Sequence, residues 1–288
     1  MSQSRHKKRD DQGACKDFQV LSPGVIRVAR CFTSPTQPYR KVKRIPDYLG
    51  MVDHTPRLKR KEYERRLAEE ETRLGQLVRE LEGSGRSLIV AFQGRDAAGK
   101  SGATAKIVTA LDYDMKVFQA VPVGPPSDEE KRRPYFMRFF EHHRLPAFGE
   151  MRVFDRSWNE ELLVVPVMEL AEPEHVQNAY AEIRTMEWLL ERGHAIVVKI
   201  WLDITADEQL SRFRKRQEEK PYKYKESDEV ARRHWGAYTR YANEMFHRTG
   251  TTFAPWYLIS SEDKRFSRVS VLEVINRELE AGLGICKP

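Results

Sequence analysis

The chain has 288 residues, of which 40% are hydrophobic, and it carries a net charge of +7 at pH 7. This length and composition predict one large domain with a buried core and a short arm. Three widely separated cysteines, Cys15, Cys31 and Cys286, suit neither a disulfide framework nor a metal site and indicate a reducing compartment. The sequence has no apolar run of membrane-spanning length and no leader-like apolar region, so we expect a soluble cytoplasmic protein.

The positive charge is concentrated near the N-terminus. Residues 1–61 contain 15 Lys and Arg against 5 Asp and Glu, a surplus of ten positive charges. Because the whole chain carries +7, residues 62–288 have a net charge of −3. A polyanion must therefore be bound by a local basic patch, and no specific nucleic-acid partner is expected.

Residues 1–54 are polar and basic with little periodicity, which predicts an N-terminal arm that is flexible or lies along the surface. Residues 55–288 are expected to form the folded domain. Thr55-Pro56 is typical of a helix N-cap followed by a first-turn proline, and leucines at helical spacing continue to Leu81. This predicts a long amphipathic helix that ends at Gly83.

The stretch Leu88–Gly102 reads LIVAFQGRDAAGKSG and matches the phosphate-binding pattern G-x-x-x-x-G-K-[ST]. Glycines leave the backbone N–H groups of such a loop open to a phosphate, and the following helix adds a positive dipole end. We expect Lys100 to reach the outer phosphates and Ser101 to offer its hydroxyl to Mg²⁺. The predicted phosphate-binding residues are Gly94, Arg95, Ala97, Ala98, Gly99, Lys100, Ser101 and Gly102.

After this loop, strands and helices alternate. The predicted strands are near 87–92, 116–121, 151–154, 195–202 and 256–260, and the predicted helices are near 100–111, 128–142, 173–192, 206–218, 228–248 and 264–281. Capping boxes mark two of the helix starts, at Ser127 with Glu130 and at Thr205 with Glu208. The alternation predicts an α/β fold with a parallel sheet covered on both faces, and a ligand at the carboxyl ends of its strands.

Two carboxylates stand out as candidate metal ligands. Asp96 lies inside a loop built for anions, which suggests that it holds Mg²⁺ or steers a nucleophilic phosphate. Asp155-Arg156 follows a β-rich run, where the carboxylate can hold Mg²⁺ through water and the arginine can clamp phosphoryl oxygens. Asp203 also ends an apolar run, but it continues into the Thr205 cap and is expected to have a strand-end role.

A basic segment supplies the local patch that the domain otherwise lacks. Residues 212–225 contain seven Lys and Arg against two Glu, and we expect Arg212, Arg216 and Lys223 to contact phosphate from a lid. The alternative is a solvated helix face. Trp235 and Tyr238, in the helix that follows, are spaced as part of a buried stripe and are assigned no chemistry.

With these residues in place, the sequence resembles the polyphosphate kinase 2 family over about residues 57–280. The motifs are LKRKEYERRL, AFQGRDAAGKSG, SDEEKRRPYFMRFFEHHRLPAFGEMRVFDRSW, the basic segment and RTGTTFAPWYLISSEDKRFSR. The resemblance implies a P-loop kinase-like three-layer sandwich with a five-stranded parallel sheet and a helical lid at about 207–245. It also implies Mg²⁺, or alternatively Mn²⁺, and assembly as a dimer or tetramer.

The resemblance assigns roles to individual residues. Asp96 and Asp155 would hold Mg²⁺ and orient the accepting phosphate, while Lys100 and Arg156 would stabilise the transferred phosphoryl group. Arg138 matches an arginine of the family. The expected reaction is direct transfer between inorganic polyphosphate and nucleoside mono- or diphosphates, with triphosphates as products or donors.

Two departures from the family pattern bear on the acceptor. The run before Arg138 lacks the His-Asp pair that many members have, and the residues after Trp158 resemble the version found in members that accept monophosphates as well as diphosphates. Two other classes of protein stay open at this point. One is an ATP-dependent nucleoside or nucleotide kinase of the thymidylate-kinase type, and the other is a non-catalytic P-loop protein that binds polyanions through its arm.

Overall fold

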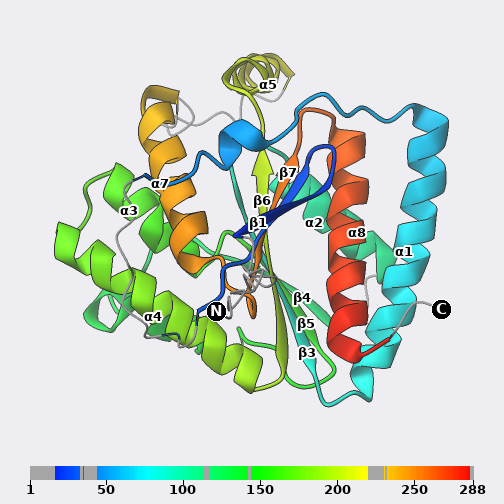
Figure 1. Cartoon of the computed structure of the whole chain (residues 1–288), viewed down its shortest axis with the longest axis horizontal. Helices are drawn as coiled ribbons and strands as arrows, with labels where there is room; N and C mark the ends of the chain where they lie inside the picture. Colours follow the sequence, from blue (N-terminus) through cyan, green and yellow to red (C-terminus); the bar gives the residue numbers. More distant parts are fainter. Residues whose placement is uncertain are drawn as a thin grey trace, which may run out of the picture.

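A seven-stranded sheet forms the centre of the computed structural model, which describes residues 17–32, 35, 44–112, 117–141, 144–219, 230 and 232–285. The strand order is β1-β2-β7-β6-β3-β5-β4 (Figure 1). The strands are β1 Phe18–Ser22, β2 Val25–Val28, β3 Ser87–Gly94, β4 Phe118–Pro122, β5 Met151–Asp155, β6 Ala195–Asp203 and β7 Trp256–Ser260.

The five strands from β4 to β7 are parallel, and all five were predicted from the sequence. Every residue of β6 is buried, as are seven of the eight residues of β3. Continuous apolar runs of this kind are typical of central strands that are covered on both faces. The pairing of β3 with β5 places Phe92 opposite Asp155, so the P-loop and the Asp155-Arg156 pair leave the same edge of the sheet.

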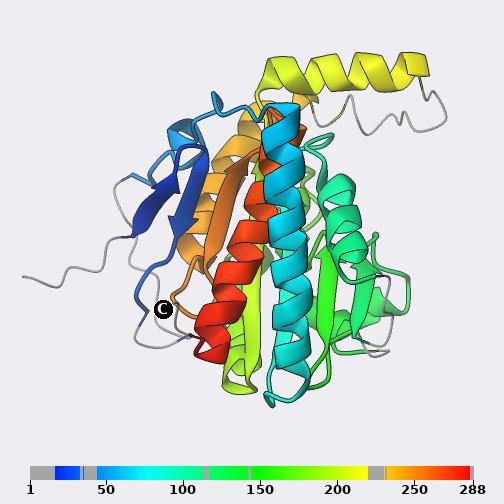
Figure 2. The same ribbon diagram turned by 90° about the vertical axis from the view of Figure 1, so that its right-hand side faces the viewer.

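Helices cover both faces of the sheet and complete three layers (Figures 1 and 2). Helices α1, α2 and α8 pack over one core, and α4, α7 and the short η4 pack over the other. The helix α5 lies beyond the carboxyl ends of the strands. The helices are α1 Arg60–Glu82, α2 Lys100–Ala110, α3 Val164–Val167, α4 Pro173–Arg192, α5 Ala206–Glu219, α7 Trp235–Thr249 and α8 Lys264–Leu283, with 3₁₀ turns at η1 Leu49–Met51, η2 Glu130–Arg132, η3 Tyr135–Phe139 and η4 Trp158–Leu162.

The N-terminal region corrects two expectations. Residues 18–28 are not a surface arm, because β1 and β2 form a hairpin whose second strand pairs antiparallel with β7. The sheet therefore has two more strands than the five predicted. Cys31 is disulfide-bonded, although the cysteine spacing was expected to suit no disulfide framework, and Cys15 and Cys286 lie outside the described residues.

Two predicted helix starts are also wrong. Helix α1 begins at Arg60 rather than after Thr55, whose amide and hydroxyl both donate to Asp53. The Ser127–Glu130 capping box forms both of its hydrogen bonds, but it precedes short 3₁₀ turns instead of an α-helix over 128–142. Pro134 explains the difference, since a proline disfavours helical backbone at the residue before it and removes an N–H donor.

The segment before α1 is attached to α7 through buried polar contacts. Tyr48 is fully buried, and its hydroxyl lies 2.9 Å from His247 Nδ1. Burial lowers the pKa of His247 to about 4, and the nearby Arg30 acts in the same direction.

No helix of the described residues is both long and apolar enough to cross a membrane.

We expect His247 to make folding stability depend on pH. The unfolded chain binds a proton near pH 6.5 and the folded chain only near 4, so stability falls as the pH drops from about 6.5 toward 4. The loss should reach about 2 kcal/mol at pH 5. Urea unfolding at pH 7 and pH 5 should show a larger decline for the wild type than for His247→Gln. An equal decline in the two proteins would contradict this role for His247.

Candidate functional site

The loop after β3 has the backbone geometry that phosphate binding requires. Gly94 has φ +146° and Gly99 has φ +104°, conformations that residues with a Cβ rarely adopt. A Cβ on Gly94 would lie 2.4 Å from the carbonyl oxygen of Leu202 on β6, so no other residue fits there. Ala97 also has a positive φ of 63°. Helix α2 begins at Lys100, so its N-terminus faces the loop as predicted.

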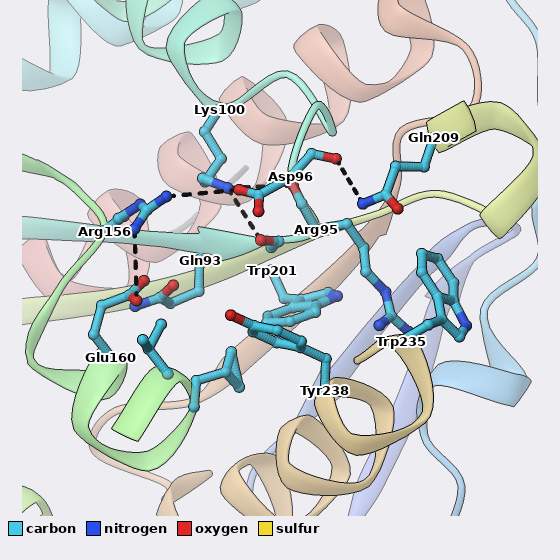
Figure 3. Close-up of a pocket in the computed structure, with 13 residues that line it drawn as sticks. Gln93, Arg95, Asp96, Lys100, Arg156, Glu160, Trp201, Gln209, Trp235 and Tyr238 are labelled. Carbon is cyan, nitrogen blue, oxygen red and sulfur yellow. Dashed lines mark hydrogen bonds and ion pairs between the residues drawn. The ribbon is translucent and has the colours of Figure 1, made fainter. Parts of the chain in front are cut away.

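A pocket lies beside this loop (Figure 3), between β3, β6, η4, α3 and the first turns of α5 and α7. Lys100 Nζ donates to the carbonyl oxygens of Gly94 (3.0 Å) and Arg95 (3.2 Å) at its edge. The lining residues are Gln93, Gly94, Arg95, Asp96, Lys100, Arg156, Glu160, Leu163, Val164, Trp201, Gln209, Trp235 and Tyr238. One wall is thus charged and the other is aromatic and aliphatic.

Arg156 bridges two carboxylates in the pocket. Its guanidinium lies 3.6 Å from Asp96 Oδ1 and 3.8 Å from Glu160 Oε2 (Figure 3). Arg156 has a left-handed backbone with φ +67°, a strained conformation that is typical of functional sites in non-glycine residues. Burial raises the pKa of Glu160, although Arg156 and Lys100 oppose the shift. Burial, with the charges of Asp96 and Glu160, raises the pKa of Tyr238 to about 12.

Asp155 lies at the end of β5, where its Oδ2 accepts a hydrogen bond from Ser101 Oγ at 3.2 Å. A P-loop hydroxyl beside a strand-end carboxylate is the pair that holds Mg²⁺ in P-loop enzymes. Among the described residues there is no cluster of three His, Cys, Asp or Glu side chains able to hold a metal. Mg²⁺ does not require such a cluster, because it keeps several waters and binds substrate phosphates. The residues present therefore fit this ion.

Arg138 lies on η3, and its side chain reaches the residues that follow β4. It donates to the carbonyl oxygen of Gly124 at 3.0 Å and pairs with Glu130 at 3.3 Å. Gly124 follows directly on Val123, whose amide donates to the carbonyl oxygen of Asp155. Arg138 is thus near the Asp155 backbone, although it does not line the pocket.

The predicted basic residues of the lid are not brought together at the pocket. Arg212 is buried and donates to the backbone carbonyls of Ala97, Ser261 and Glu262, so its guanidinium lies against the loop backbone and not in the pocket lining. The Arg216 guanidinium lies 5.5 Å from the Phe213 ring on α5, away from the pocket lining. Lys223 lies outside the described residues.

The side chain of Arg95 is turned away from the phosphate cradle. It contacts Asp203 Oδ1 at 3.2 Å and Thr239 Oγ1 at 2.8 Å, and it stacks 3.8 Å from the centre of the Trp235 ring. Only the backbone of Arg95 belongs to the predicted loop site. Asp203 is buried and also accepts from Trp201 Nε1, in agreement with its expected strand-end role.

The sequence did not point to several residues of the pocket. Gln93, Glu160, Trp201 and Gln209 were not predicted, and Trp235 and Tyr238 are only partly buried and line the pocket instead of a closed core. For Gln209 the sequence offered one signal, the capping box at Thr205. It fixes the start of α5 and so the position of Gln209 in its first turn, because Glu208 N donates to Thr205 Oγ1 at 3.2 Å. The predicted loop residue Gly102 lies in the first turn of α2. A Cβ built on it would lie 3.5 Å from the Arg268 guanidinium, which is ordinary van der Waals contact.

A mostly parallel sheet covered by helices, with a P-loop and an Asp-Arg pair at adjacent strand ends, defines a protein of the P-loop kinase-like class. The model of one family within this class, Polyphosphate kinase 2 (PPK2), matches residues 57–283. The chain belongs to the polyphosphate kinase 2 family.

Relatives support the assignment. The chain is 38% identical over 235 residues to a polyphosphate:AMP phosphotransferase of Pseudomonas aeruginosa, covering 81% of this chain and 47% of that protein. It is 34% identical to ADP-polyphosphate phosphotransferase 2 of Rhizobium meliloti, covering 78% of this chain and 73% of that one. The crystal structure of polyphosphate kinase 2 from Arthrobacter aurescens superposes with a TM-score of 0.78 at 28% identity, covering 91% and 94%. The chain spans about half the length of the polyphosphate:AMP phosphotransferases it matches.

Proposed function

We propose that this protein is a Mg²⁺-dependent phosphotransferase that moves a phosphoryl group between inorganic polyphosphate and nucleoside mono- or diphosphates. One observation carries the proposal: Arg156 lies between Asp96 and Glu160 in a pocket whose rim is the P-loop with Lys100. A cation placed over the loop can stabilise a phosphoryl group as it leaves one chain for another. The carboxylate of Asp96 beside it can orient the accepting phosphate.

The proposed chemistry is positioning and charge stabilisation, with no covalent enzyme intermediate. The backbone amides of the loop and Lys100 hold the phosphates of the donor. Arg156 neutralises charge on the transferred group, and Arg138 adds positive charge from η3. The terminal phosphate of the nucleotide attacks in line, and the shortened polyphosphate leaves.

Mg²⁺ is the proposed cofactor, with Mn²⁺ as an alternative metal. Asp155, with Ser101 beside it, and Asp96 are the residues that would hold the ion, partly through water. When bound, Mg²⁺ neutralises the negative charge of the phosphate oxygens between donor and acceptor. The two carboxylates keep the ion next to the loop.

The aromatic wall of the pocket suits the nucleoside part of the acceptor. Trp235 and Tyr238 are partly buried rings that line the pocket, and the buried Trp201 with Leu163 and Val164 adds apolar lining. Stacking on such rings is tolerant of the base, because every base has a π-face. We propose that monophosphates are accepted as well as diphosphates, since the chain resembles an AMP phosphotransferase and ADP phosphotransferases.

A donor and acceptor panel tests this function. Purified protein with Mg²⁺ should convert AMP, ADP, GMP or GDP to the next higher nucleotide when polyphosphate is the donor. Use of ATP alone as donor would favour a kinase of the thymidylate-kinase type, which family membership does not support. No product with any acceptor would refute the proposal.

The non-catalytic alternative concerns the N-terminal residues. A truncation should remove residues 1–16 only, because β1 begins at Phe18 and belongs to the sheet. Lost binding to polyphosphate with unchanged turnover would assign polyanion binding to those residues.

We further propose, from the family resemblance, that the protein acts in the cytoplasm as a dimer or tetramer.

A further inference from the structure

Three consecutive carbonyls of the P-loop are held by side chains from outside the loop. The carbonyl oxygen of Asp96 accepts from Gln209 Nε2 at 3.1 Å, as Figure 3 shows. The carbonyl oxygens of Ala97 and Ala98 accept from Arg212 NH1 (3.0 Å) and from Ser261 Oγ (2.5 Å). All three donors are buried, two on α5 and one just after β7. The loop backbone is therefore fixed by distant parts of the chain.

Fixing a carbonyl also fixes the amide of the next residue. The peptide bonds of the described residues are all trans, so the C=O and N–H of one peptide plane point in opposite directions. The amides opposite these three carbonyls belong to Ala97, Ala98 and Gly99. The Ala98 amide closes a turn on the carbonyl of Arg95 at 3.1 Å. In the described part of the chain, no hydrogen bond uses the amides of Ala97 and Gly99.

The two donors on α5 are well held themselves. Gln209 and Arg212 are three residues apart, which puts them on one face of the helix, and they are 1% and 9% exposed. Glu208 pairs with the Arg212 guanidinium at 2.6 Å, and the same guanidinium donates to the carbonyls of Ser261 and Glu262. The first half of α5 is thus bound to the loop and to the residues that follow β7.

We propose that Gln209 and Arg212 are positioning residues: Gln209 holds the carbonyl of Asp96 outward and so keeps the unused Ala97 amide directed at the bound phosphate, and Arg212 holds the carbonyl of Ala97 and so fixes the turn that Ala98 closes on Arg95. The identity of that phosphate as part of a polyphosphate chain rests on the proposed function; the orientation of the amides does not. The same contact also fixes the position of the Asp96 side chain, because Gln209 holds the backbone carbonyl of Asp96 itself. The two residues act through the backbone of the loop; Arg212 does not line the pocket, and Gln209 lines it beside its contact with the Asp96 carbonyl.

The test uses near-isosteric variants and measures binding of tripolyphosphate by calorimetry in the presence of Mg²⁺. Gln209→Glu replaces the donor to Asp96 with a carboxylate, which repels the carbonyl. Arg212→Lys keeps the charge but cannot reach several carbonyls at once. At pH 8 each variant should bind tripolyphosphate about tenfold more weakly than the wild type, the effect of about one lost charge-assisted hydrogen bond. Gln217→Glu and Arg214→Lys, exposed on the same helix, should bind within twofold.

A pH series separates positioning from a general loss of folding. Once protonated, the carboxyl group that Gln209→Glu introduces can donate to the Asp96 carbonyl, so the affinity of this variant relative to wild type should recover between pH 8 and pH 5. Wild-type affinity in both variants at pH 8, or a deficit in Gln209→Glu that is the same at both pH values, would overturn the proposal. A wild type that binds tripolyphosphate but phosphorylates no nucleotide would instead refute the proposed function, and the variant comparison would still decide the positioning role.

Discussion

Asp96→Asn should lower the rate of polyphosphate-dependent nucleotide phosphorylation by about 10³-fold, the scale of losing one charged group at a phosphoryl-transfer centre. The substitution keeps the shape of the side chain and removes its negative charge. The side chain then no longer forms an ion pair with Arg156, 3.6 Å away, and cannot help to hold Mg²⁺ beside the acceptor. Steady-state kinetics with AMP or ADP and saturating polyphosphate measure the effect.

The fold should tolerate this change. The Asp96 backbone is held by Gln209, and that contact does not involve the carboxylate. Thermal unfolding of the variant should therefore stay close to that of the wild type. Asp128→Asn is a matched control, because the Asp128 side chain is 94% exposed and should leave the rate unchanged. Near-normal turnover by Asp96→Asn would remove this residue from the mechanism.

Asp155→Asn is expected to lower the rate by about 10²- to 10³-fold and to raise the Mg²⁺ concentration needed for half-maximal activity. An amide oxygen can still accept from Ser101, whose hydroxyl lies 3.2 Å from the carboxylate. The lost charge weakens the hold on Mg²⁺, because hard cations prefer carboxylate oxygens. Rates titrated against Mg²⁺ measure the shift.

The metal dependence is the informative part of this experiment. If Asp155 only supported the fold, the variant would lose rate and thermal stability together, with an unchanged Mg²⁺ requirement. That pattern would contradict a metal-holding role. A rate that recovers at high Mg²⁺ or with Mn²⁺ would agree with it.

The parallel strands were predictable because their signal is local. Strands β3 and β6 are continuous apolar runs bounded by turn residues, and burial on both faces requires that composition. Strand β2 has only four residues in a basic, weakly periodic region, and its pairing partner β7 lies some 230 residues further along the chain. The helix predicted over 128–142 failed at Pro134, although the capping box before it formed.

The site residues that the sequence predicts are those with a local motif, and the residues that it misses reach the site through contacts between distant segments. The P-loop and Asp155-Arg156 are motifs whose chemistry is carried by neighbours in sequence. The basic run predicts Arg212 to be a phosphate ligand, whereas in the structure its guanidinium is buried against a loop carbonyl. Glu160 and Tyr238 reach the pocket only because η4 and α7 meet beside β3, which no local pattern predicts.

The proposed activity of this chain is the transfer of phosphate from polyphosphate to a nucleotide. Phosphorus NMR of purified protein with Mg²⁺, polyphosphate and AMP tests it most directly, because donor, acceptor and any hydrolysis product are seen together. We predict that β-phosphate signals of ADP grow as polyphosphate shortens, without release of orthophosphate, and that Asp96→Asn slows this change by about 10³-fold. Shortening of polyphosphate with orthophosphate as the only product, or no change in either substrate, would contradict it.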